Sequence, residues 1–144
     1  MHRSVPFNEL TALYSVADAC LLSSTRDGMN LVSFEYVACQ DKKKGVLVLS
    51  EFAGSATFMR DGSIPFHPAN TTEMSDALYA ALNLGPEERH KKHQFLRDFV
   101  NTHTRCARPL KISLFETLGV FEILFMRFGS VADARAVRDG VKPL

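Results

Sequence analysis

The sequence predicts an α/β fold built on a parallel sheet, and three observations lead to this prediction. Segments with helical and with strand-like periodicity alternate along the chain. The strand predicted over 45–49, GVLVL, is apolar on both faces, which is typical of a parallel strand covered by helices. A glycine-containing loop joins an earlier predicted strand to a helix, and ligands of open α/β sheets bind at such loops.

The first helix is expected over residues 8–18, just after a proline. Its apolar residues recur at helical spacing: Leu10, Leu13, Tyr14 and Ala17. The brief apolar run at 19–22 fits a buried strand, and the polar run at 23–30 fits a loop. A second helix is expected over 31–40, with an apolar side made of Leu31, Phe34, Val37 and Ala38.

The second half of the chain continues the alternation. After the strand at 45–49, a loop over 50–55 leads to a weaker strand over 63–67. Pro65 removes one backbone donor from that strand, which places it at a sheet edge or an irregularity.

Two helices close the predicted fold. Asn70 or Thr71 is placed to cap the first of them, and Glu73 to complete a capping box from Asn70. This helix runs to about residue 83, and the Gly85-Pro86 pair ends it and begins a last helix that runs to about residue 103.

Composition favours an ordinary globular domain. The 144 residues are 46% hydrophobic and 23% charged with a formal net charge of +1, so no overall field indicates nucleic acid, a membrane or an acidic partner. Cys20, Cys39 and Cys106 show no metal or redox spacing and are expected to be reduced. The start lacks a secretory pattern, and the longest apolar stretch, 110–128, carries four charges. We therefore expect a cytoplasmic protein without a membrane span.

The loop and helix start at 23–40 form a candidate phosphate site. Gly28 would let the backbone take a positive φ or approach a ligand closely. The N–H groups at the helix start, those of Met29, Asn30, Leu31 and Val32, would be free to donate to a phosphate or pyrophosphate, which the helix dipole also favours.

Two carboxylates flank this helix start. Asp27 lies in the predicted loop and Glu35 about one turn into the helix, so both could accept hydrogen bonds from hydroxyls of one sugar nucleotide. The alternative is that Asp27 is a turn or cap residue and Glu35 a solvated helix residue. On their spacing alone we favour this alternative.

Three other patterns have a functional and a plain interpretation. His90 and His93 could be a metal pair or part of a solvated helix face. The lysines at 42–44 could touch phosphate or form a solvated turn. The phenylalanines of the C-terminal segment, Phe115, Phe121, Phe125 and Phe128, could form an interaction stripe, an added core helix or a poorly folded extension. We favour the plain interpretation in each case.

The segment RDGMNLVSFEYVACQ, residues 26–40, resembles the signature of the trehalose-6-phosphate synthase family. The segments VPFNELTALYSVADACLLSS, KKGVLVLSEFAGSA and HPANTTEMSDALYAALNLGPEERHKKH resemble the same family in register. The resemblance covers about residues 3–104. It implies half of a GT-B fold, in which two Rossmann-like domains enclose the site, and this chain would supply the C-terminal, donor-binding half.

The family transfers glucose from UDP-glucose to glucose 6-phosphate with retention, in trehalose biosynthesis. The resemblance implies that Asp27 is the candidate catalytic residue and accepts hydrogen bonds from hydroxyls of the donor glucose. The backbone of the binding segment would hold the diphosphate and the sugar; this segment is Gly28, Met29, Asn30, Leu31 and Val32. Glu35 would bind the ribose of UDP. No DxD motif is present, and neither a metal nor another cofactor is expected.

The resemblance also sets limits on activity. We expect residues 1–104 to be a fragment of the UDP-glucose-binding domain and residues 105–144 to be a divergent tail. The domain that binds glucose 6-phosphate, and the basic pair that the family uses against the diphosphate, have no counterpart in these residues. The chain alone is therefore expected to be inactive unless the missing domain is supplied, and whether it is an enzyme stays open. The alternatives are a regulatory or nucleotide-sugar-binding module, associated with other synthase subunits, and a truncated product without a stable function.

Overall fold

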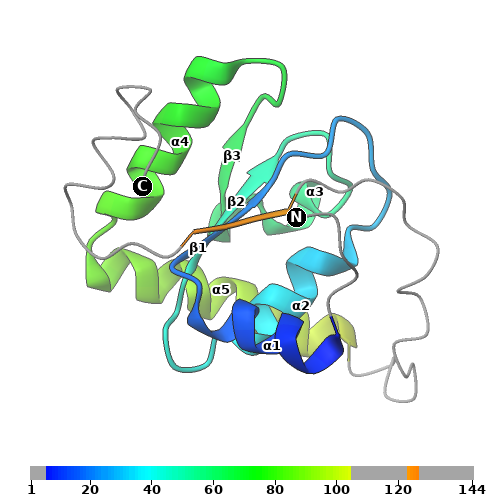
Figure 1. Ribbon diagram of the computed structural model, residues 1–144, viewed down its shortest axis with the longest axis vertical. Helices are drawn as coiled ribbons and strands as arrows, with labels where there is room; N and C mark the ends of the chain where they lie inside the picture. Colours follow the sequence, from blue (N-terminus) through cyan, green and yellow to red (C-terminus); the bar gives the residue numbers. More distant parts are fainter. Residues whose placement is uncertain (1–5, 105–122, 127–144) are drawn as a thin grey trace.

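The sheet has four strands in the order β3-β2-β1-β4, of which the first three are parallel and β4 is antiparallel to β1 (Figure 1). The structure is a computed structural model that describes residues 6–104 and 123–126. The strands are β1 (Ala19–Leu22), β2 (Val46–Ser50), β3 (Ile64–Phe66) and β4 (Ile123–Met126). The parallel α/β fold and its three predicted strands are thus confirmed, and β3 lies at the edge because Pro65 cannot donate to a further strand.

The helices lie close to their predicted positions. Their bounds are α1 (Phe7–Val16), α2 (Leu31–Cys39), α3 (Ala56–Met59), α4 (Thr71–Asn83) and α5 (Pro86–Thr104), with a short 3-10 helix, η1 (Arg60–Gly62), after α3. The sequence analysis did not predict α3 or η1. The close approach of η1 to α5 is a tertiary contact, since a Cβ on Gly62 would lie 2.5 Å from the Leu96 Cγ.

Helices cover the sheet on both faces, which explains why β1 and β2 are buried along their whole length. Cys20, Leu22, Leu47 and Leu49 point to the layer that contains α1, α2 and α5. The alternate residues Leu21, Val46 and Val48 point to α4, and they pack on Ala77, Leu78 and Ala81. Figure 1 shows α1, α2 and α5 grouped together and α4 apart from them.

The buried face of α2 differs from the predicted one. Leu31 is 44% exposed and Ala38 is also exposed, whereas Tyr36 and the polar residues Ser33 and Gln40 are buried beside Val37. The polar pair is buried because its groups are hydrogen-bonded. The Ser33 hydroxyl donates to the Asn30 carbonyl at 2.6 Å, and the Gln40 amide donates to the Ala17 carbonyl at 3.0 Å.

The predicted cap of α4 is confirmed, although the capping box is completed differently. The Asn70 Oδ1 accepts from the Glu73 backbone N–H at 3.2 Å. The Glu73 carboxylate accepts from the His67 N–H at 3.1 Å, because the N–H of Asn70 already donates to the His67 carbonyl. The two bonds tie the end of β3 to the start of α4.

Most of the predicted tail, 105–144, lies outside the described residues, including Cys106 and the phenylalanines of the stripe other than Phe125. Within it β4 is described, and its antiparallel pairing with β1, with Ala19 opposite Met126, was not predicted. No helix in the described part of the chain is long and apolar enough to cross a membrane.

Candidate functional site

Two loops meet at the carboxyl ends of neighbouring parallel strands, where ligands of open α/β sheets bind. One is the β1–α2 loop (23–30), and the other is the β2–α3 loop (51–55). The hydroxyl of Ser50 donates to the Ser24 carbonyl at 2.7 Å, and the Gly54 N–H donates to the Gly28 carbonyl at 2.9 Å. Position 54 requires glycine, since a Cβ there would lie 2.3 Å from the Gly28 oxygen. The second loop therefore supports the backbone of the first.

The first turn of α2 presents backbone donors at this edge of the sheet. Asn30 is the N-cap and is buried, and its Oδ1 accepts from the Ser33 N–H at 2.9 Å. Leu31 and Val32 occupy the first two helical positions, where no intrahelical acceptor exists for their N–H groups. Two of the predicted donors thus remain available to an anion, and Asn30 serves as the cap.

Asp27 is held beside this helix start by the same cap residue. The Nδ2 group of Asn30 donates to the Asp27 Oδ2 at 2.6 Å. One buried amide therefore caps the helix through its oxygen and orients the half-buried Asp27 carboxylate through its nitrogen. A second oxygen of Asp27 is left for a ligand hydroxyl.

Glu35 is half-buried, and α1 contributes its partner. The hydroxyl of Tyr14 donates to the Glu35 Oε2 at 3.2 Å. Burial raises the pKa of Glu35 above its ordinary value, and the Tyr14 hydrogen bond opposes that rise. The alternative of a solvated helix residue is therefore wrong for Glu35. Glu35 and Asp27 are oriented separately, Glu35 by Tyr14 and Asp27 by Asn30.

Gly28 lies on the open side of the loop. Its φ lies outside the left-handed region, and a Cβ built on it would meet no atom within 4 Å. The sequence suggested two reasons for a glycine at position 28, a positive φ or close approach to a ligand. The first is wrong, because Gly28 does not adopt the left-handed φ that favours glycine in this conformation. Close approach of the backbone to a ligand remains a prediction.

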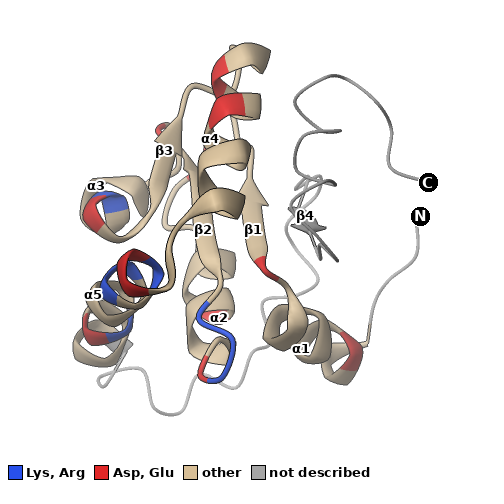
Figure 2. Cartoon of the chain, turned by 90° about the vertical axis from the view of Figure 1, so that its left-hand side faces the viewer, with Lys and Arg blue, Asp and Glu red and all other residues tan. Residues whose placement is uncertain are grey.

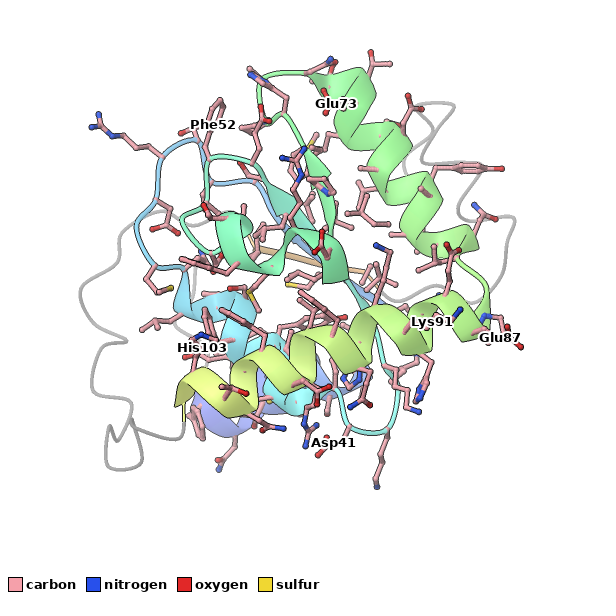
Figure 3. All side chains as sticks on the ribbon, turned by 180° about the vertical axis from the view of Figure 1, so that it is seen from behind. Asp41, Phe52, Glu73, Glu87, Lys91 and His103 are labelled. Carbon is pink, nitrogen blue, oxygen red and sulfur yellow. The ribbon has the colours of Figure 1, made fainter. Side chains whose placement is uncertain are left out.

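Met29 was predicted from the sequence as part of the binding segment, whereas the position of Phe52 and His67 near this edge was not predicted. Met29 is 58% exposed beside the glycine. The exposed Phe52 ring lies edge-on to the His67 ring at a centroid distance of 5.1 Å, so the end of β3 joins the edge of the site. Figure 3 shows Phe52 at the end of the molecule opposite to Asp41, which precedes β2. The exposure of Met29 and Phe52 is a property of the fold, and no local pattern signals it.

The lysine turn at 42–44 lies at the other end of the sheet (Figure 2). It borders an open groove of about 570 Å³ with the first turns of α5. The Lys43 Nζ pairs with the Asp18 carboxylate at 2.7 Å, and the Lys44 Nζ lies 2.8 Å from the His90 Nδ1. This groove is not part of the candidate site, because the turn precedes β2 while the two loops follow β1 and β2.

The expected solvated histidine face on α5 is wrong for His93. His93 is 6% exposed, and burial, followed by the charges of Lys44 and His90, lowers its pKa. Among the described residues, no group of three His, Cys, Asp or Glu side chains is placed to hold a metal ion.

The fold and this loop arrangement define a Rossmann-like α/β domain with its ligand edge at the carboxyl ends of β1 and β2. Residues 1–107 match the glycosyltransferase family 20, and the chain belongs to that family. It is 54% identical over 104 residues to the alpha,alpha-trehalose-phosphate synthase (UDP-forming) of Yarrowia lipolytica, covering 72% of this chain and 22% of that relative. The chain thus spans about a fifth of the length of the curated relatives it matches.

Solved structures agree with this assignment. A trehalose-6-phosphate protein from E. coli bound with UDP-2-fluoro glucose has a TM-score of 0.67 and 34% identity, covering 71% of this chain and 23% of that one. A synthase (UDP-forming) from Burkholderia xenovorans in complex with glucose-6-phosphate has a TM-score of 0.66 and 36% identity, covering 71% and 23%. The resemblance to trehalose-6-phosphate synthases and their GT-B fold is therefore confirmed.

Proposed function

We propose that this chain binds UDP-glucose as the donor-binding part of a retaining trehalose-6-phosphate synthase. The observation that carries the proposal is the start of α2. Its N–H groups at Leu31 and Val32 have no intrahelical acceptor. Along the chain Asp27 precedes them and Glu35 follows them, and each carboxylate is oriented by a hydrogen bond. Family membership and the structural similarity to a protein bound with UDP-2-fluoro glucose support it.

Each group has a distinct part in this proposal. The backbone of Gly28 to Val32 holds the diphosphate, since the open N–H groups and the helix dipole favour negative charge there. Asp27 accepts hydrogen bonds from hydroxyls of glucose, and Glu35 accepts them from the ribose. As the diphosphate leaves, the same donors stabilise the charge that develops on it, without a need for a metal.

Glucosyl transfer requires more than the donor-binding groups named above. The acceptor has to be held against the anomeric carbon in the right orientation. Among the residues described here, Arg26 of the β1–α2 loop is exposed to solvent, and the lysine turn lies at the other end of the sheet. We therefore propose that these 144 residues bind the donor, and that transfer to glucose 6-phosphate requires the second Rossmann-like domain.

The test is an NMR titration of UDP and UDP-glucose into the wild type, Asp27→Ala and Glu35→Ala. We expect the wild type to bind with a Kd of about 1 mM, near −4 kcal/mol. Glu35→Ala should lower the affinity for both ligands, whereas Asp27→Ala should lower the affinity for UDP-glucose more than that for UDP. Glu88→Ala, which removes an exposed carboxylate on α5, is the matched control and should change neither. Equal affinities in all four proteins would reject the assigned roles.

A further inference from the structure

Glu35 belongs to α2, whose first turn forms part of the candidate site, but the orientation of its carboxylate is set from α1. The phenol of Tyr14, 21 positions earlier, donates to the Glu35 Oε2 at 3.2 Å. The Glu35 Oε1 accepts no hydrogen bond from the described residues, so it is the oxygen left for a ligand. A carboxylate that is oriented before binding loses less side-chain freedom when the ligand arrives.

The Tyr14 side chain is itself firmly placed. It is 1% exposed, and its ring packs edge-on against the Tyr36 ring at a centroid distance of 6.3 Å. The side-chain amide of the fully buried Gln40 donates to the Tyr14 carbonyl, which ties α1 to the end of α2. The hydroxyl therefore has little freedom to leave Glu35.

The direction of the hydrogen bond is also settled. Burial, and then the charge of Glu35, raise the pKa of the Tyr14 phenol, so it stays protonated and donates to the carboxylate. A hydrogen bond to a charged acceptor is stronger than one between neutral groups.

We infer that Tyr14 is a positioning residue for the sugar-nucleotide site, which holds Glu35 in the orientation that receives ribose hydroxyls. This inference rests on the proposed function. It assigns a role in ribose recognition to a side chain that touches no ligand and that lies outside the 26–40 motif. Its specific consequence is that Tyr14 contributes to the affinity for a ribonucleotide and not to the affinity for a diphosphate as such.

The test compares UDP with 2′,3′-dideoxy-UDP, which lacks both ribose hydroxyls. Each is titrated by NMR into the wild type, Tyr14→Phe and Tyr36→Phe. Tyr36→Phe is the matched control, since it removes a phenol oxygen from the same cluster, and the Tyr36 hydroxyl has no hydrogen-bond partner in the described part of the chain. We expect Tyr14→Phe to lower the affinity for UDP about tenfold and to leave that for dideoxy-UDP unchanged. Tyr36→Phe should change neither.

The possible outcomes distinguish failure of the Tyr14 positioning role from failure of the proposed function. If the wild type does not bind UDP, the proposed function fails and this inference with it. If the wild type binds UDP but Tyr14→Phe binds it equally well, or loses both ligands equally, the positioning role is wrong and the proposed function stands.

A second measurement needs no substitution, and it applies if Tyr14→Phe does not fold. In wild-type protein with ¹³C-labelled tyrosine, the Tyr14 Cζ resonance should move when UDP binds, because the ligand polarises the carboxylate that the phenol contacts. It should stay in place with dideoxy-UDP. Equal shifts with the two ligands, or none with either, would overturn the inference.

Discussion

Gly28 shows how a single residue can matter for binding and not for the fold. Its Cα faces open space, and its φ is one that other residues adopt. Gly54, in the supporting loop, is the opposite case, because a Cβ there would collide with the backbone of Gly28. Two glycines in contact therefore have different reasons to be glycine: the reason for Gly54 lies within the fold, and the reason we propose for Gly28 is the ligand.

We predict that Gly28→Ala leaves the free energy of unfolding unchanged or raises it by about 0.4–1 kcal/mol, because alanine restricts the unfolded chain. The added methyl should obstruct the diphosphate and lower the affinity for UDP about tenfold or more. Urea denaturation and NMR titration measure the two effects. Gly85→Ala is the control, since that position is also open and lies far along the chain at the start of α5. Unchanged UDP affinity in Gly28→Ala would contradict the proposed approach of the diphosphate.

Glu35 should give the stability a particular dependence on pH. Its pKa in the folded state is raised above the ordinary value of 4.5, mainly by burial. The folded protein therefore holds this proton more tightly than the unfolded chain does, and the associated stability is present at low pH and lost as the pH rises through the raised pKa.

We predict that Glu35→Gln removes this loss, because glutamine does not ionise. The stability of the variant relative to the wild type should therefore increase with pH above about 4.5 and level off once Glu35 is ionised in the folded wild type. Urea denaturation of both proteins over a pH series measures it, with Glu88→Gln on the surface of α5 as the control. A difference that is constant across the series would show that Glu35 is not desolvated in the folded protein.

At the scale of elements, α2 and α4 begin in the same way but have different surroundings. Both are capped by an asparagine whose Oδ1 accepts from the N–H three residues later, at 2.9 Å for Asn30 and 3.2 Å for Asn70. At α2 the amide nitrogen of the cap also donates to the candidate sugar-binding carboxylate of Asp27. The stability of this helix start is thus coupled to the geometry of the site.

We predict that Asn30→Ala and Asn70→Ala each lower the stability by about 1–2 kcal/mol. Of the two, we expect only Asn30→Ala to lower the affinity for UDP-glucose. Asn30→Ser separates the two roles, because serine keeps a cap acceptor but removes the donor to Asp27. It should retain most of the stability and bind UDP-glucose about three- to tenfold more weakly, with a smaller effect on UDP. Thermal unfolding and NMR titration measure these values. Unchanged UDP-glucose affinity in Asn30→Ser would show that the hydrogen bond from Asn30 to Asp27 does not contribute to binding.

At the scale of the whole molecule, the described part of the chain offers one binding edge and no opposing surface. The proposed site is open on the side of Gly28 and Met29. Retaining transfer requires the acceptor and the donor to be enclosed together, with water excluded. The relatives are several times longer than this chain, which covers 22% of the synthase from Yarrowia lipolytica.

We predict that a purified polypeptide of these 144 residues releases no UDP from UDP-glucose in a manner that depends on glucose 6-phosphate. A coupled assay for UDP measures this, and a full-length relative serves as the positive control. Release that depends on glucose 6-phosphate and is lost in Asp27→Ala would show that these residues suffice for transfer. Binding of the donor without transfer would instead fit the alternative of a nucleotide-sugar-binding module.

The sequence by itself determined the order of helices and strands, a capped start of α4 at Asn70 or Thr71, and the loop that holds Asp27 and Gly28. These features depend on residues within about four positions of one another, and local patterns express them well. The same locality explains why α3 and η1 were missed, since their short turns are held by contact with α5.

Only the tertiary structure decided which groups meet. It paired Tyr14 with Glu35, seated Gly54 on Gly28, turned Ser33 and Gln40 of α2 inward and buried His93. The Tyr14–Glu35 contact, the Gly54–Gly28 contact and the burial of Gln40 join segments that are far apart along the chain, and they depend on how the helices pack on the sheet. Ser33 bonds to the nearby Asn30, but the same packing decides that this face of α2 turns inward. The buried Gln40 amide finds its acceptors in the carbonyls of Tyr14 and Ala17, and no periodicity in the sequence encodes where such partners will be.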